Sequence, residues 1–172
     1  IDSATMMNKG FEMIEAFWLF GINPKNIEIV VHPQSIIHSL VAYKDGSFLA
    51  QLSSPDMITP IAYSLAWPKR MAIPKSPLDL QNLSALTFEA PDTVRFPALN
   101  LARESIRSLG NSSLVLNTAN EIAVQGFLSR QIKFTDIIPF SKTILDKPNN
   151  EDIKLSTSVV IFFINYNMLP RD

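Results

Sequence analysis

The fold of this chain is decided by residues 3–20, which read SATMMNKGFEMIEAFWLF. Apolar side chains occupy most sides of a helix drawn through residues 4–20, and Gly21 follows as a stop signal. Asp2 and Ser3 precede this segment as candidate N-caps. A helix that is apolar on most faces belongs inside a protein, so we predict one continuous, buried helix here.

Four polar side chains share one narrow stripe of this helix, at spacings i, i+3, i+4 and i+7: Asn8, Lys9, Glu12 and Glu15. Hydroxyls at a helix start, beside free backbone N–H groups, favour an anion, and Asn8 and Lys9 add donors for phosphate oxygens. Glu12 supplies a hard oxygen ligand for Mg²⁺ or Mn²⁺. The alternative, which spacing alone favours, is a capped core helix in which Lys9 pairs with Glu12.

The next part of the chain predicts mixed α/β structure. The expected elements are a short buried strand at 27–31, a hairpin formed by 38–43 and 47–52, and a helix at 57–67. Asp45-Gly46 supplies the turn of the hairpin. Both tryptophans, Trp18 and Trp67, are expected in the core, and the proline-rich residues 68–97 are expected to cross between layers.

Three further helices are predicted after Pro97, at 98–109, 112–130 and 135–147. Short connections imply antiparallel neighbours, so the fold class is α+β, a mixed α/β part followed by a small helical bundle. Asn117, Asn120 and Glu121 form a polar patch that we assign to hydrogen bonding between helices or domains. The apolar run 159–164 is expected to be either a buried strand or a non-native end.

Composition excludes several classes of protein. The net charge is −1, which offers no electrostatic footprint for nucleic acid or an anionic membrane surface. No cysteine is present, so disulfides and thiolate metal sites are excluded. No segment approaches the about 18 apolar residues of a membrane helix. Because the chain begins with Ile1 rather than Met, we expect it to have been cut from a longer protein.

Several blocks of sequence occur in the order found in one enzyme family: residues 3–12, HPQSIIHS at 32–39, PDM at 55–57, AWP at 66–68, LSALTF at 83–88 and NTANEIAV at 117–124. Together they resemble the 1-deoxy-D-xylulose-5-phosphate reductoisomerase family over about residues 1–147. The resemblance implies that residues 1–95 are part of the catalytic domain, which binds substrate and metal, followed by a linker. Residues 96–147 would form the C-terminal helical domain, and 148–172 are a divergent, unassigned tail.

The resemblance also implies roles for residues of the first helix. Ser3, Asn8 and Lys9 would hold the phosphate and hydroxyl groups of a phosphorylated sugar substrate. Glu12 would be one of three acidic ligands of the catalytic Mg²⁺ or Mn²⁺. Glu15, one turn further on, would at most support the metal ligands without binding the metal itself.

A second group of implied site residues lies further along the chain. His38 resembles an active-site histidine of the family, the alternative being a half-buried strand histidine. Ser35 is expected to line the pocket, and Met57 to pack near the nicotinamide of NADPH, although alone it reads as a core residue. His32, at a strand end before Pro33, is assigned a structural role.

The family converts 1-deoxy-D-xylulose 5-phosphate to 2-C-methyl-D-erythritol 4-phosphate with NADPH, in the non-mevalonate pathway of isoprenoid biosynthesis. All five glycines here are isolated, and no G-x-G pair exists to cradle a dinucleotide. The family's two other metal ligands are not matched either, so we expect the chain alone to be inactive or nearly so. The resemblance further implies a homodimer, in a bacterial cytoplasm or a plastid-type organelle.

Two other hypotheses remain open. In the first, the chain is a non-catalytic dimerisation or assembly module derived from that enzyme. In the second, it is an unrelated small phosphate-binding protein built around the anion site at the start of its first helix.

Overall fold

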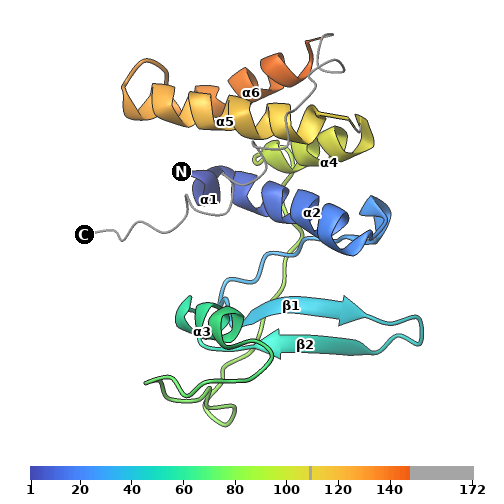
Figure 1. Cartoon of the computed structure of the whole chain (residues 1–172), viewed down its shortest axis with the longest axis vertical. Helices are drawn as coiled ribbons and strands as arrows, with labels where there is room; N and C mark the ends of the chain where they lie inside the picture. Colours follow the sequence, from blue (N-terminus) through green and yellow to red (C-terminus); the bar gives the residue numbers. More distant parts are fainter. Residues whose placement is uncertain (109, 148–172) are drawn as a thin grey trace. The chain divides into compact units, whose positions relative to one another are not determined.

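The computed structural model describes residues 1–108 and 110–147 (Figure 1). Within them the chain forms two compact units, each described here by itself. The first joins Ile1–Glu28 to the described residues from Asp92 onward, and the second is Ile29–Pro91. Among the described residues no helix is long and apolar enough to cross a membrane. The expectation for the run 159–164 lies outside the described residues.

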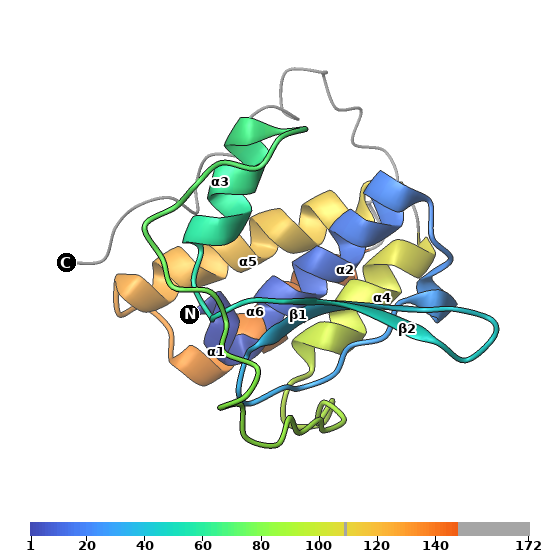
Figure 2. The ribbon, with the colours of Figure 1, turned by 90° about the horizontal axis from the view of Figure 1, so that it is seen from below.

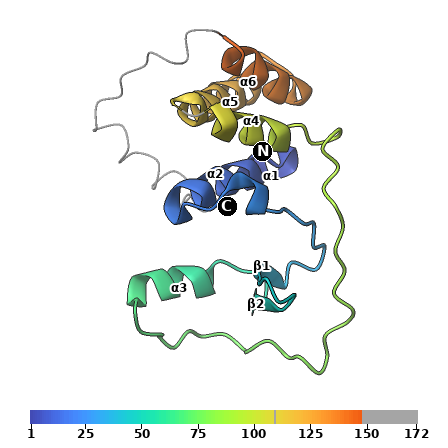
Figure 3. The same ribbon diagram turned by 90° about the vertical axis from the view of Figure 1, so that its right-hand side faces the viewer.

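The first unit is helical. Its elements are α1 (Asp2–Thr5), α2 (Met7–Phe20), the 3-10 turn η1 (Pro24–Asn26), α4 (Ala98–Ser108), α5 (Ser112–Leu128), the 3-10 turn η2 (Phe134–Asp136) and α6 (Ile137–Leu145). Helix α2 packs against α4, α4 against α5, and α5 against α6 (Figures 1 and 3). The predicted C-terminal bundle is therefore confirmed, with its helix ends shifted by one or two residues.

The core of this unit is made by one face of each helix. Its fully buried large side chains are Met7, Met13, Leu99, Leu116 and Ile137. Helices α2 and α4 lie side by side (Figure 2). Gly10 allows this close approach, because a Cβ at this position would lie 3.0 Å from the Cβ of Ala102. The first helix thus packs on the bundle that follows it by about ninety residues in the sequence. The predicted domain ranges follow a different division and stay a prediction.

The expectation of one continuous helix from residue 4 is wrong. The backbone turns left-handed at Met6, with φ 61°, which separates α1 from α2. The Asp2 and Ser3 side chains do not cap a helix, since Asp2 and Ser3 lie within α1. Instead the Thr5 hydroxyl accepts a hydrogen bond from the Met7 amide at 3.3 Å. A buried threonine therefore replaces a backbone acceptor that the break removes.

Helix α2 is buried at its start and exposed at its end, which corrects the expectation of a buried helix. Met7, Gly10, Met13 and Ile14 are buried, whereas Trp18, Leu19 and Phe20 are 60–75% exposed. Trp67 is 70% exposed, so neither tryptophan lies in the core. The apolar pattern was correct, but no described residue covers that end of α2.

The second unit contains a β-hairpin and one helix (Figure 1). Strands β1 (Ile37–Ala42) and β2 (Phe48–Leu52) pair antiparallel, with a register irregularity between Ile37 and Ser39, and α3 spans Ile58–Ala66. Gly46 has φ 87°, and the Asp45 carboxylate accepts hydrogen bonds from the backbone and hydroxyl of Ser47. The hydroxyl bond, followed by the backbone bond, lowers the pKa of Asp45. The predicted hairpin and helix are confirmed.

The predicted buried strand at 27–31 is wrong. This segment follows η1 and contributes only an isolated bridge between Val31 and Glu89. The Arg103 guanidinium of α4 donates to the carbonyl oxygens of Pro24 and Ile27, at 3.4 and 3.3 Å. A side chain thus satisfies the backbone at the start of the segment, in place of a sheet partner.

Candidate functional site

The break at Met6 brings Ser3 and Asn8 together. In an unbroken helix, residues five apart point about 140° away from each other. Here the Asn8 side-chain amide donates to the Ser3 hydroxyl at 3.1 Å, and both side chains are exposed. The left-handed residue therefore builds a small polar surface from two short segments of helix. Its strain, of about 1 kcal/mol, is of the kind found where backbone geometry serves a site.

Lys9 and Glu12 lie beside this pair on α2. The Lys9 ammonium donates to the Glu12 carboxylate at 2.5 Å, with the two side chains 46% and 56% exposed. The same ion pair is expected if α2 is simply a capped core helix. The contact alone therefore does not distinguish a binding site from an ordinary helix surface. Exposed ion pairs stabilise by at most about 1 kcal/mol, so either group can be recruited by a ligand.

Glu15 lies one turn beyond Glu12. Partial burial, and then the charge of Glu12, raise the pKa of the Glu15 carboxyl above its ordinary value. Two carboxylates that repel each other on one stripe favour a cation between or near them. Across the described residues, however, no group of three His, Cys, Asp or Glu is placed to hold a metal ion. The residues present fit one ligand of a hard divalent cation, Glu12, and not a complete site.

Asn120 of α5 joins the bundle to α1. Its side chain is 2% exposed, and its amide nitrogen donates to the Asp2 carboxylate at 3.1 Å. The predicted hydrogen bonding between helices is thus confirmed for this residue, whereas Glu121 is exposed. The contact holds α1, and hence Ser3, against the core of the unit.

The second unit carries the other predicted residues. The Nε2 atom of His38, at the start of β1, lies 2.8 Å from the hydroxyl of Ser53, just after β2. Ser35 has a left-handed backbone, with φ 51°, and its amide donates to the His32 carbonyl. Met57 is 68% exposed at the start of α3, so it is not a core residue.

His32 has the structural role assigned to it. Its Nδ1 atom lies 2.8 Å from the Thr87 carbonyl oxygen, which only accepts, so Nδ1 carries the proton. The imidazole ring stacks on Phe88 at a centroid distance of 4.8 Å. These contacts hold the segment before β1 against residues 87–88. The neighbouring backbone bridge between Val31 and Glu89 joins the same two segments.

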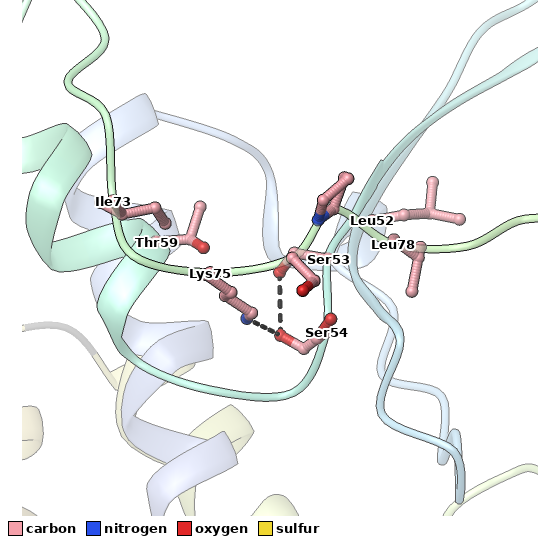
Figure 4. A pocket seen from close by; sticks show the side chains of 9 residues that line it. Leu52, Ser53, Ser54, Thr59, Ile73, Lys75 and Leu78 are labelled. Carbon is pink, nitrogen blue, oxygen red and sulfur yellow. Dashed lines mark hydrogen bonds between the residues drawn. The ribbon is translucent and has the colours of Figure 1, made fainter.

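Sequence reasoning missed the residues that surround the turn between β2 and α3. Lys75 forms an ion pair with Asp56 and donates to the Ser54 carbonyl at 3.3 Å (Figure 4). A cavity of about 240 Å³ lies beside them, lined by Leu52, Ser53, Ser54, Thr59, Ile73 and Lys75, among others. Asp56 had a readable signal, because an aspartate shortly before an apolar helix is a typical cap. Lys75, in the proline-rich crossing, had none.

The predicted site residues therefore fall into two groups. Ser3, Asn8, Lys9 and Glu12 share one exposed surface of the first unit. Ser35, His38 and Met57 belong to the second unit. There His38 of β1 contacts Ser53, at the start of the short turn after β2, and Met57 lies at the end of that turn.

Family models match both ends of the described region. Residues 52–162 match the DXP reductoisomerase C-terminal domain, and residues 1–20 match the 1-deoxy-D-xylulose 5-phosphate reductoisomerase C-terminal domain. The 1-deoxy-D-xylulose 5-phosphate reductoisomerase of Cupriavidus pinatubonensis is 58% identical over 147 residues, covering 86% of this chain and 37% of the relative. That of Ralstonia pickettii is 58% identical over 137 residues, covering 80% of this chain and 35% of the relative.

Solved structures give the same picture. The reductoisomerase from Zymomonas mobilis in complex with NADPH superposes with a TM-score of 0.79 at 59% identity, covering 84% of this chain and 38% of that one. A DOX-P reductoisomerase in complex with NADPH, fosmidomycin and magnesium gives 0.81 at 53% identity, covering 86% and 36%. The chain thus spans little more than a third of the length of the relatives it matches.

Proposed function

Since this chain belongs to the 1-deoxy-D-xylulose 5-phosphate reductoisomerase family, we propose that it supplies the substrate-binding surface and one metal ligand of such an enzyme. The complete enzyme would convert 1-deoxy-D-xylulose 5-phosphate to 2-C-methyl-D-erythritol 4-phosphate with NADPH. The chain alone would be inactive or nearly so. The bacterial source of the relatives supports a bacterial cytoplasmic protein over a plastid one.

The surface built by Ser3, Asn8 and Lys9 would hold the substrate phosphate. It offers a hydroxyl, an amide and an ammonium group within two turns of chain, all exposed. Gripping a phosphate that does not react supplies binding energy to orient the reacting carbons. The hydrogen bond between Ser3 and Asn8 is the single observation that carries this proposal, since only the break at Met6 makes it.

Glu12 would be the ligand that this chain gives to Mg²⁺ or Mn²⁺. The ion, when bound, supplies a Lewis acid for negative charge on substrate oxygens. The carboxylate is exposed and, within the part of the chain that the structure describes, pairs with Lys9, so it can turn to a cation without unfolding the helix. The remaining ligands would come from outside the described residues.

His38 and Met57, of the second unit, would each contribute a side chain to the reaction. The imidazole of His38 can donate a hydrogen bond to, or exchange a proton with, a substrate oxygen. The exposed thioether of Met57 would pack on the nicotinamide of NADPH, which supplies the hydride. The dinucleotide itself would be held elsewhere, because no glycine pair here suits it.

Titration of the chain with fosmidomycin, with and without Mn²⁺, tests this proposal by calorimetry. One related reductoisomerase is in complex with fosmidomycin and magnesium. Metal-dependent binding that is lost in Asn8→Ala supports a partial substrate site. Weak binding indifferent to metal supports the unrelated phosphate-binding protein, and no binding contradicts the proposal for the isolated chain.

A homodimer is proposed as the assembly of the complete enzyme, and the second unit gives the observation that favours it. Over residues 29–91, all of which the structure describes, no side chain is buried. Val41, Phe48 and Leu49 of the hairpin are 51–68% exposed. Apolar surface of this extent on a paired ribbon favours burial against further chain. Sedimentation velocity over a range of concentrations tests this, and a monomer at all concentrations contradicts it for the chain alone.

A further inference from the structure

A continuous set of hydrogen bonds runs through the turn that joins β2 to α3. It starts at His38, whose Nε2 atom meets the Ser53 hydroxyl at 2.8 Å. The Ser53 hydroxyl in turn donates to the Ser54 carbonyl oxygen at 3.2 Å (Figure 4). Because a hydroxyl has one proton and the carbonyl only accepts, Ser53 must accept from His38, so Nε2 carries a proton.

Lys75 holds the middle of this set. Its ammonium donates to the same Ser54 carbonyl oxygen at 3.3 Å and pairs with the Asp56 carboxylate. The Asp56 amide donates to that oxygen as well, at 2.9 Å. The Lys75 side chain is 18% exposed and Asp56 28%, so the pair is only partly screened by water. The Ser54 carbonyl oxygen thus accepts hydrogen bonds from three donors. One of them, Lys75, comes from a later part of the chain and holds the turn in place.

Asp56 carries the connection on to Met57. One of its carboxylate oxygens pairs with Lys75, and the other accepts from the Ile58 amide at 2.8 Å and the Thr59 amide at 3.5 Å. These are the first amides of α3, so Asp56 sets where the helix begins. Met57 lies between the carboxylate and those amides, and its backbone geometry follows from them.

We propose that Lys75 is a positioning residue that fixes, through Ser54 and Asp56, the His38 imidazole and the Met57 side chain relative to each other. The inference rests on the proposed function only in assuming that His38 contacts the substrate and that Met57 contacts the nicotinamide. Lys75 itself contacts no reacting atom in this scheme. It holds one turn, at one end of which Ser53 contacts the His38 imidazole and at the other end of which lies Met57.

The first test uses the chain as it is. Methionine methyl groups are followed by ¹³C NMR in wild type, Lys75→Leu and Lys75→Arg, with Lys69→Leu as a control at an exposed lysine of the same unit. The Met57 methyl signal should move and sharpen in Lys75→Leu, return in Lys75→Arg, and stay in place in the control. An unchanged Met57 signal in Lys75→Leu overturns the inference whether or not the chain is part of a reductoisomerase.

The second test uses a full-length reductoisomerase carrying this sequence. Lys75→Met should raise the KM for NADPH about tenfold and lower kcat by a similar factor, because both groups move. Ser53→Ala should lower kcat with little change in that KM, because it touches only the His38 end. Lys75→Arg should recover most of the loss.

Outcomes of the second test separate two failures. A full-length wild type that does not turn over substrate with NADPH contradicts the proposed function, while the NMR result still decides the role of Lys75. A loss of kcat that only follows the loss of folded protein, with the KM for NADPH unchanged, shows a purely structural lysine and overturns the inference.

Discussion

At the scale of single residues, geometry decides which polar groups can act together. Ser3 and Asn8 meet because Met6 is left-handed, and Glu12 is available because it is exposed and held by one lysine. The polar stripe was readable from the sequence, but spacing alone favoured a capped core helix, and the resemblance to a family was needed to suggest that it binds an anion and a cation. The break was not, because no glycine or proline marks Met6 and left-handed non-glycine residues are uncommon. Lys75 was unreadable too, since its carbonyl partner lies 21 residues away in the sequence.

Glu12→Gln, made in a full-length reductoisomerase carrying this sequence, should lower kcat by about two orders of magnitude or more, because a metal ligand loses its charge but keeps its shape. Folding should be nearly unaffected, since the carboxylate is exposed. Steady-state kinetics at saturating Mn²⁺ measure the change, with Glu15→Gln as the matched control one turn away. Equal activity of Glu12→Gln and wild type would remove the metal role from Glu12.

Glu15 predicts a dependence of stability on pH. Its raised pKa means that the folded chain binds the proton more tightly than the unfolded chain. Its contribution to the free energy of unfolding is therefore most favourable below the ordinary carboxyl pKa and declines as pH rises through the raised value. Between about pH 4 and pH 7, the free energy of unfolding of Glu15→Gln should rise by a few tenths of a kcal/mol relative to that of wild type. The effect is small because water screens the group. Urea unfolding at several pH values measures the difference, and a constant difference contradicts it.

At the scale of elements, packing explains what periodicity did not. The hairpin was predictable because Asp-Gly encodes its turn, and the bundle because its three helices have strong patterns and short connections. The strand predicted at 27–31 is absent because Arg103, a side chain distant in sequence, satisfies the first carbonyl of the segment, that of Ile27. The prediction that the end of α2 is buried was wrong, because an apolar pattern shows which face of a helix prefers burial but not which partner covers it.

The close packing of α2 on α4 predicts opposite effects at two helical glycines. Gly10→Ala should lower the free energy of unfolding by about 1 kcal/mol, because the new Cβ would press on Ala102 between two helices that cannot both yield. Gly126→Ala should raise it by about 0.5–1 kcal/mol, since its Cβ would make an ordinary contact, 3.5 Å from Ile132, and alanine favours helix. Urea unfolding measures both. Stabilisation by Gly10→Ala would show that the helices are free to separate.

At the scale of the whole molecule, burial is unevenly shared between the two units. Every buried residue among those described belongs to the first unit. The chain also spans little more than a third of the length of its relatives. The family was readable from ordered motifs. Which surfaces remain uncovered depends on other parts of the protein, which no local pattern describes.

Hydrogen exchange should therefore differ sharply between the units. Amides of α2, α4, α5 and α6 should exchange slowly, and those of β1, β2 and α3 should exchange within seconds to minutes in the isolated chain. Mass spectrometry of peptides from labelled protein measures both sets at once. Equal protection in the two units would mean that the hairpin is stabilised by association, and repeating the experiment at higher dilution would identify that case.

The hairpin has one more consequence. Among the described residues the sheet has two strands, which leaves a row of backbone groups able to pair with added strands on the outer side of β1 and of β2. Two separately expressed pieces of a reductoisomerase, one of them this chain, can then be brought together by strand addition. On the proposed function, such a pair would form a split enzyme. We expect its reassembly in trans to be read as growth of a bacterium that depends on that enzyme, so that every substitution discussed above can be tested by genetic selection.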